Sequence, residues 1–144
     1  MQTTATIQHG FATSTTTQAP ATSRGMMLAG RIISGFVALF LLMDGVMRMA
    51  GFAPYLEGMV QFGYPVHLAF PIGLALTIGT LLYVIPRTAV LGAIVLTGYL
   101  GGAVASHVRM EDRFFVTGLI FGVLVWAGLY LRDARVRALL PLRA

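Results

Sequence analysis

Cysteine and lysine are both missing from this chain of 144 residues. Without cysteine the protein forms no disulfide, has no thiol nucleophile and cannot hold an iron–sulfur cluster with its own side chains. Charge is also scarce, because acidic and basic residues together make up 10% of the chain, whereas about 25% is usual in soluble domains. Hydrophobic residues supply 57% of the sequence, so its composition predicts an integral membrane protein.

Long apolar runs predict how the chain crosses the bilayer. A spanning helix needs about 20 apolar residues, and runs of this kind cover residues 28–49, 66–85, 88–108 and 114–131. We therefore expect an all-α fold, an antiparallel four-helix transmembrane bundle formed by residues 26–144. Residues 1–25 are rich in Thr and Ser and predict a disordered cytoplasmic tail.

The ten basic residues, all of them arginine, predict the orientation. Most flank the side of the expected bundle that carries both termini: Arg24, Arg31, Arg87, Arg132, Arg135, Arg137 and Arg143. The positive-inside rule therefore places both termini in the cytoplasm and predicts a multi-pass protein of the inner (cytoplasmic) cell membrane. The arginines lie between the apolar runs rather than along one exposed stripe, which argues against a nucleic-acid partner.

A charge pair interrupts the first apolar run, where Asp44 and Arg48 stand four positions apart. This spacing puts both side chains on one face of a helix, so carboxylate and guanidinium can pair without a third partner. One interpretation is a structural anchor at the end of the helix. The other is a polar floor beneath an outward-facing pocket.

Further polar residues fall at the same end of the predicted bundle: His67, Tyr99, His107 and Arg109. With Asp44 and Arg48 they form a candidate polar pocket, in which donors and acceptors could meet the carbonyl groups of a quinone. The same description fits a lipid or a small hydrophobic solute. Haem is disfavoured because His67 and His107 would both have to face inward at equal depth, and the His and acid spacings typical of metal sites are missing.

The segment between the first and second runs is rich in aromatic residues, proline and glycine. A short amphipathic turn is expected at residues 55–62. Its aromatic side chains, with Tyr64, predict part of the outer aromatic belt at the membrane surface.

Small residues predict how the helices pack. Gly98 and Gly102 form a GxxxG pair with Gly101 in the adjoining row, and Gly118 and Gly122 form a second pair. Such residues let helix backbones approach closely in a membrane. We expect them to pack the bundle, with residues 88–108 as its packing centre; contacts in a homo-oligomer are the alternative.

Several stretches resemble one family of membrane proteins: "LFLLMDGVMRM", "MVQFGYP", "YVIPRTAVLGAIVLTGYLGGAVASHVR" and "WAGLYLRDARVRALLP". Together they are similar to the DoxX-like family, over residues 32–141. The resemblance implies a four-helix membrane bundle. The family is named after a subunit associated with thiosulfate:quinone oxidoreductase and terminal oxidase complexes, and the resemblance assigns no catalytic residue.

Three functions remain open from the sequence. The first is an accessory or membrane subunit of a redox system that binds a quinone or a redox partner protein at the outer leaflet. The second is a non-enzymatic transport or resistance factor for small molecules, and the third is a structural membrane protein. No nucleophilic triad, phosphate-binding loop or pair of interior carboxylates supports hydrolase or nucleotide chemistry.

Overall fold

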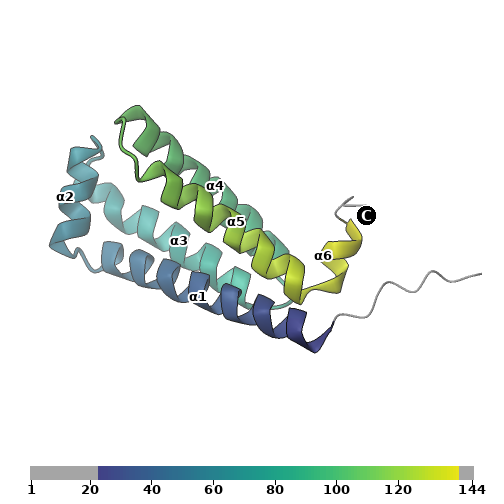
Figure 1. Cartoon of the computed structure of the whole chain (residues 1–144). Coiled ribbons are helices and arrows are strands. Elements are labelled where there is room, and N and C mark those ends of the chain that lie inside the picture. Colours follow the sequence, from purple (N-terminus) through teal and green to yellow (C-terminus); the bar gives the residue numbers. More distant parts are fainter. Residues whose placement is uncertain (1–22, 140–144) are drawn as a thin grey trace, which may run out of the picture.

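Helices joined by short connections form the part of the chain that the computed structural model describes, residues 23–139 (Figure 1). In chain order these are α1 (Arg24–Met49), α2 (Ala53–Gln61), the single 3₁₀ turn η1 (Val66–Leu68), α3 (Ala69–Val84), α4 (Ala89–Arg109), α5 (Phe115–Arg132) and α6 (Ala134–Leu139). Four segments are long and apolar enough to span a membrane: α1, η1 with α3, α4 and α5. The predicted four-helix membrane bundle is confirmed.

The first helix begins earlier than residue 28, where the sequence predicts it. Ser23 caps α1, because its hydroxyl accepts a hydrogen bond of 3.2 Å from the backbone N–H of Met26. Such a bond satisfies a backbone donor that the first turn of a helix leaves unpaired. Arg24 and Gly25 are thus helical, and residues 1–22 of the predicted tail lie outside the described residues.

Local sequence sets the other boundaries. Gly51 and Gly63 adopt positive φ angles of 70° and 76°, at the turns that enter and leave α2, a conformation that glycine adopts without strain. Pro86 follows the end of α3, because proline cannot continue the hydrogen-bond ladder. The expected turn at 55–62 is a full helix, α2, whereas α6 was not predicted.

The four spans form a ring in which each helix packs against two neighbours. α1 contacts α3 and α5, and α4 contacts the same two helices from the opposite side. The prediction that residues 88–108 form the packing centre is therefore wrong. The shared core consists mainly of aliphatic side chains from all four spans: Val37, Leu41, Leu76, Ala93, Leu96, Leu100, Val125 and Leu129.

The two ends of the bundle differ (Figure 1). One end carries residues 50–68, which include α2 and η1, and the α4–α5 connection at residues 110–114. We call it the α2 end. The other carries the start of α1, the α3–α4 connection and α6, and we call it the α6 end. Between them, large apolar side chains such as Leu39 and Val123 are 72% and 68% exposed, which suits a surface surrounded by lipid rather than water.

Tyr83 joins all four spans near the α6 end. Its side chain is fully buried, and its hydroxyl donates a 2.9 Å hydrogen bond to the carbonyl of Val125 on α5. The hydroxyl of Ser34 on α1 lies 2.9 Å from the hydroxyl oxygen of Tyr83. Arg132 donates to the Tyr83 carbonyl at 2.6 Å, and its guanidinium lies 4.6 Å from the centre of the tyrosine ring.

The closest helix approach also involves Tyr83. A Cβ at Gly92 on α4 would overlap the backbone of Tyr83 on α3, so glycine is required there. On another side, Gly128 makes room for the tyrosine hydroxyl, because a Cβ there would lie 2.6 Å from Ser34 Oγ and 3.1 Å from Tyr83 Oη. The four helices are therefore locked together most tightly at this level.

Most of the glycines that the sequence analysis named for helix packing contact no other helix, unlike Gly92 and Gly128. A Cβ at Gly98, Gly101, Gly102 or Gly122 would meet nothing within 4 Å, so the prediction that they pack the bundle is wrong. Gly118 does face a neighbour, since its Cβ would lie 2.7 Å from Val104 Cγ2. A GxxxG pattern marks one face of a helix but does not say whether another helix covers that face. A homo-oligomer contact at the open positions stays a prediction.

Replacing one glycine of α4 by alanine tests which face of this helix is packed. Gly92→Ala forces α3 and α4 apart, and we expect a loss of about 1–3 kcal/mol in unfolding free energy, as in other overpacked cores. Gly101→Ala on the same helix, where space is open, is expected to be neutral or slightly stabilising. Denaturant titration of both variants in detergent micelles measures this; equal stabilities would contradict the packing described.

A double-mutant cycle tests the bond between Tyr83 and Ser34. We expect Tyr83→Phe and Ser34→Ala to be coupled by about 0.6 kcal/mol, the average for hydrogen bonds between membrane helices. Unfolding of the single and double variants in a detergent titration gives the coupling. The matched control pairs Tyr99→Phe with Ser34→Ala, for which additive effects are expected, and additivity in both cycles would argue against the bond.

Candidate functional site

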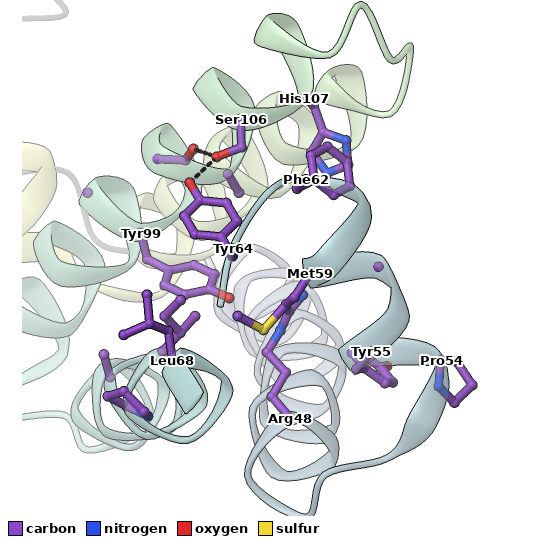
Figure 2. Close-up of a pocket in the computed structure, with 17 residues that line it drawn as sticks. Arg48, Pro54, Tyr55, Met59, Phe62, Tyr64, Leu68, Tyr99, Ser106 and His107 are labelled. Atoms are coloured by element: carbon purple, nitrogen blue, oxygen red, sulfur yellow. Dashed lines mark hydrogen bonds between the residues drawn. The ribbon is translucent and has the colours of Figure 1, made fainter. Parts of the chain in front are cut away.

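A pocket of about 620 Å³ lies at the α2 end, within the size range of sites for small molecules. α3 and α4 form its walls, α2 covers it, and Arg48 reaches it from α1 (Figure 2). Most of the lining is apolar or aromatic: Pro54, Tyr55, Met59, Phe62, Leu68, Pro71, Ile72, Ala75, Gly98, Gly102 and Ala103. We call this space the α2 pocket.

The pocket exists because α3 and α4 carry small side chains where they face each other near the α2 end. Nearer the α6 end the two helices touch, with Gly92 against the backbone of Tyr83 and Gly79 against Val95. Toward the α2 end, Gly98 and Gly102 find no neighbour within 4 Å, and both line the pocket. The open glycines thus border a cavity instead of a helix contact.

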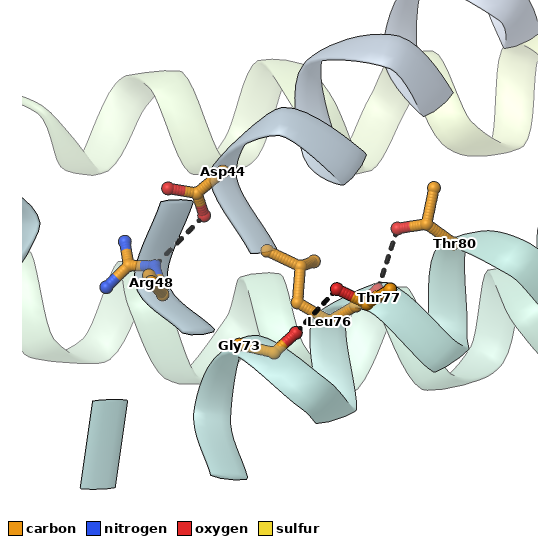
Figure 3. A network of polar contacts seen from close by, with 6 residues as sticks. All are labelled: Asp44, Arg48, Gly73, Leu76, Thr77 and Thr80. Atoms are coloured by element: carbon orange, nitrogen blue, oxygen red, sulfur yellow. Dashed lines mark hydrogen bonds and ion pairs between the residues drawn. The ribbon is translucent and has the colours of Figure 1, made fainter. Parts of the chain in front are cut away.

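Asp44 and Arg48 form the ion pair that their spacing predicts (Figure 3). Arg48 Nε donates to Asp44 Oδ2 at 3.2 Å, and the two side chains are 24% and 16% exposed. Only the arginine lines the pocket, where its guanidinium lies 5.4 Å from the centre of the Tyr55 ring. Because Nε makes the bond to Asp44, the two terminal nitrogens of the guanidinium lie outside it and can donate to a ligand.

The same helix face is pressed against α3. A Cβ at Gly73 would lie 2.7 Å from the carbonyl of Gly45 and 3.0 Å from Arg48 Cβ. Thr77 turns its hydroxyl back to the Gly73 carbonyl at 2.8 Å (Figure 3). This close crossing fixes the backbone that carries Arg48, so the arginine projects from a rigid base.

Tyr99 is the deepest polar side chain of the pocket. It lies near the middle of α4, and its hydroxyl points toward the space between Met59 and Arg48 (Figure 2). A phenol can both donate and accept a hydrogen bond. Tyr99 and Arg48 therefore direct polar groups from different helices into one apolar space.

His107 stands at the rim of the pocket and is held on two sides. Its Nδ1 lies 2.9 Å from Asp112 Oδ2, and the edge of its ring meets Phe62 at a centroid distance of 4.6 Å. The hydrogen bond with His107, together with one from the backbone N–H of Phe114, lowers the pKa of Asp112. His107 thus links the α4–α5 connection to the end of α2.

Two further bonds fasten α2 over the pocket. Arg109 Nη2 donates to the Phe62 carbonyl at 2.6 Å, just after the end of α2. The hydroxyls of Tyr64 and Ser106 lie 2.7 Å apart and join the α2–α3 connection to α4 (Figure 2). Arg109 therefore positions the roof rather than lining the pocket.

The structure sorts the candidate residues named from the sequence. Arg48, Tyr99 and His107 line one pocket, with Asp44 behind the arginine. His67 is exposed in η1 and is not part of the lining. The sequence analysis did not predict that α2 covers the pocket. The aromatic-rich segment before α3 was the feature that could have indicated it.

A second groove of about 600 Å³ lies between α4 and α5. Gly101, Gly118 and Gly122 line it, and at its side Trp126 donates to the hydroxyl of Thr97 at 2.8 Å. Its lining is almost entirely apolar. It offers no set of converging polar groups, so the α2 pocket is the better candidate for a specific ligand.

The polar side chains of the α2 pocket can donate and accept hydrogen bonds. Its lining holds an arginine, tyrosines, a serine and a histidine, but neither a carboxylate nor a thiol. Within residues 23–139, no three His or acidic side chains gather closely enough to hold a metal ion. The arrangement suits an apolar molecule that offers a hydrogen-bond acceptor.

These features define a helical membrane protein with four candidate spans and a pocket of ligand size between them. A family model described as the DoxX-like family matches residues 32–128. The chain therefore belongs to the DoxX-like family, as its motifs predict. Comparisons with curated proteins and with solved structures gave no significant match.

The lowered pKa of Asp112 predicts how the α2 end responds to acid. Its ionised form stabilises the folded connection above about pH 4, the usual pKa of aspartate, and this contribution is lost as pH falls through the lower folded value. We expect Asp112→Asn to remove that step from the thermal midpoint measured against pH. Glu57→Gln, an exposed acid on α2, is the control; an unchanged acid step in Asp112→Asn would contradict the prediction.

Proposed function

We propose that the α2 pocket binds an uncharged, lipid-soluble carbonyl compound, with a quinone as the best-fitting class. The observation that carries this proposal is the approach of Arg48 and Tyr99 into one apolar pocket of about 620 Å³. Carbonyl oxygens accept hydrogen bonds from both groups. Apolar walls with a few converging polar groups are typical of sites for such molecules.

The charge balance of the site favours a neutral ligand. Arg48 is already paired with Asp44, so the two side chains together carry no net charge. An added anion or cation would have to leave water for an apolar pocket without a free counter-charge, which is costly. A neutral head group with carbonyl oxygens avoids that cost and still uses the donors of Arg48.

The role that follows is that of an accessory or membrane subunit of a redox system. The chain has no cysteine, and the α2 pocket contains no cluster of metal-binding side chains. Electron transfer to or from a bound quinone would therefore be performed by a partner protein with its own redox group. In this proposal the chain holds the quinone and presents it to that partner.

The arginines support an orientation for this site. Arg24, Arg31, Arg87 and Arg135 all belong to the α6 end, where Asp133 is the nearby acid in the described chain. The positive-inside rule puts such an end in the cytoplasm. In our proposal the protein lies in the cytoplasmic membrane with the α2 pocket in the outer leaflet.

Direct binding to the purified full chain tests the proposed function. The probe is a fully substituted benzoquinone with a decyl chain, and saturable binding is measured by equilibrium partition in phospholipid nanodiscs. The double variant Asp44→Asn with Arg48→Gln keeps the pocket neutral but removes the charged donor. We expect it to bind the probe about tenfold more weakly, because a hydrogen bond to a charged group contributes about 1.5–3 kcal/mol. Tyr99→Phe is expected to weaken binding several-fold.

Tyr130→Phe is the matched control, because Tyr130 lines the groove between α4 and α5 instead of the α2 pocket. We expect its affinity to equal that of the wild type. Binding that no variant alters would remove the α2 pocket from consideration. Absence of saturable binding in the wild type would contradict the proposed function itself.

A further inference from the structure

We infer that the ligand enters the α2 pocket sideways from the bilayer, through a gap between α3 and α4 beside Gly98 and Gly102, and that it carries an apolar chain that occupies this gap. The inference rests on the proposed function of the pocket and adds a route and a molecular shape. We call the gap the lateral opening, and define it by Pro71, Ala75, Gly98 and Gly102.

The lateral opening is exposed at the level of the spans. Pro71, Ala75, Gly98 and Gly102 all line the pocket, and all four are exposed. They belong to the segments Val66–Val84 and Ala89–Arg109, which are long and apolar enough to cross a membrane. Because these segments would lie within the bilayer, an opening of the pocket beside these residues would face lipid.

The aqueous side of the pocket is partly covered by α2 and the residues that follow it. Met59 of α2 is 4% exposed and lies over the pocket (Figure 2). Phe62 packs on His107, and its carbonyl is bound by Arg109 at 2.6 Å. A molecule that passes through this part of the roof would break these contacts with α4, whereas none of them crosses the lateral opening.

The order of polar and apolar groups indicates the shape of the ligand. Arg48 and Tyr99 lie inside, under α2, whereas Ala75, Gly98 and Gly102 in the opening have no polar side chains. A molecule that fits both parts has a polar head and an apolar tail. The tail leaves between the helices, where glycine leaves the space that any larger residue would fill.

A bond crosses the top of this opening. Tyr64 in the α2–α3 connection meets Ser106 on α4 at 2.7 Å, and Ser106 also donates to the Gly102 carbonyl at 2.9 Å. These bonds hold the connection against α4 at the membrane surface. The opening is therefore limited to the apolar part of the spans. An apolar ligand chain fits there better than a polar substituent would.

Photo-crosslinking in lipid bilayers tests the inference. The probe is a fully substituted benzoquinone with a decyl chain that ends in a diazirine, applied to the full chain and mapped by mass spectrometry. We expect saturable crosslinks on the exposed residues beside the opening, namely Leu74, Ile78 and Val95. Saturable crosslinks on α2 or its connections would overturn the lateral route while leaving the proposed function standing.

A matched pair of variants on α4 controls the experiment. Gly98→Leu fills the opening, and Gly101→Leu fills the groove on the other side, where space is equally open. We expect Gly98→Leu to reduce saturable crosslinking at least tenfold and Gly101→Leu to leave it unchanged. Equal yields in both variants would overturn the lateral opening.

A probe without a chain separates the two proposals. The same benzoquinone head with a methyl group in place of the decyl chain is used as a competitor in the wild type. Competition by this head group, together with blocked crosslinking in Gly98→Leu, supports both the site and the opening. Wild-type crosslinks that are displaced neither by this head group nor by the decyl benzoquinone without a diazirine would overturn the proposed function. The lateral route would then be overturned with it.

Discussion

The bundle depends on one buried tyrosine. Tyr83 sits where all four spans meet: its hydroxyl binds α1 and α5, its backbone lies against Gly92 of α4, and Arg132 covers its ring. In a membrane, helices are not driven together by the hydrophobic effect, so close packing and hydrogen bonds carry more of the association. The level of Tyr83 near the α6 end therefore holds all four helices, whereas toward the other end Gly98 and Gly102 of α4 border a pocket.

The two ends of the bundle differ in what their buried polar groups meet. At the α6 end, polar groups are satisfied by other parts of the chain, as in the bond from Arg137 to the carbonyls of Tyr130 and Leu131 at 3.1 and 3.2 Å. At the α2 end, Arg48 and Tyr99 face a cavity instead. Polar groups in membrane helices that face a cavity are the usual starting point for a hypothesis about function.

The sequence predicts the fold well because the dominant signal, long apolar runs, is itself the physical cause of membrane insertion. Much of the candidate site follows as well: antiparallel spans bring Arg48, Tyr99 and His107 to one pocket. The absence of His67 from the pocket lining could not be predicted, since His67 lies in the single turn of η1. For Gly98 and Gly101, spacing defines adjacent faces of α4 without saying what covers each one.

The ion pair of Asp44 and Arg48 has a consequence for how the protein is made. Both partners belong to α1, so this helix carries its own charge compensation as it leaves the ribosome and enters the membrane. It can be inserted before any later span has been synthesised. Tyr83 differs, because the groups that satisfy its hydroxyl lie on α1 and α5. Insertion of the first helix is thus independent of assembly, whereas the hydrogen bonds of Tyr83 on α3, the second span, are completed only when the last span arrives.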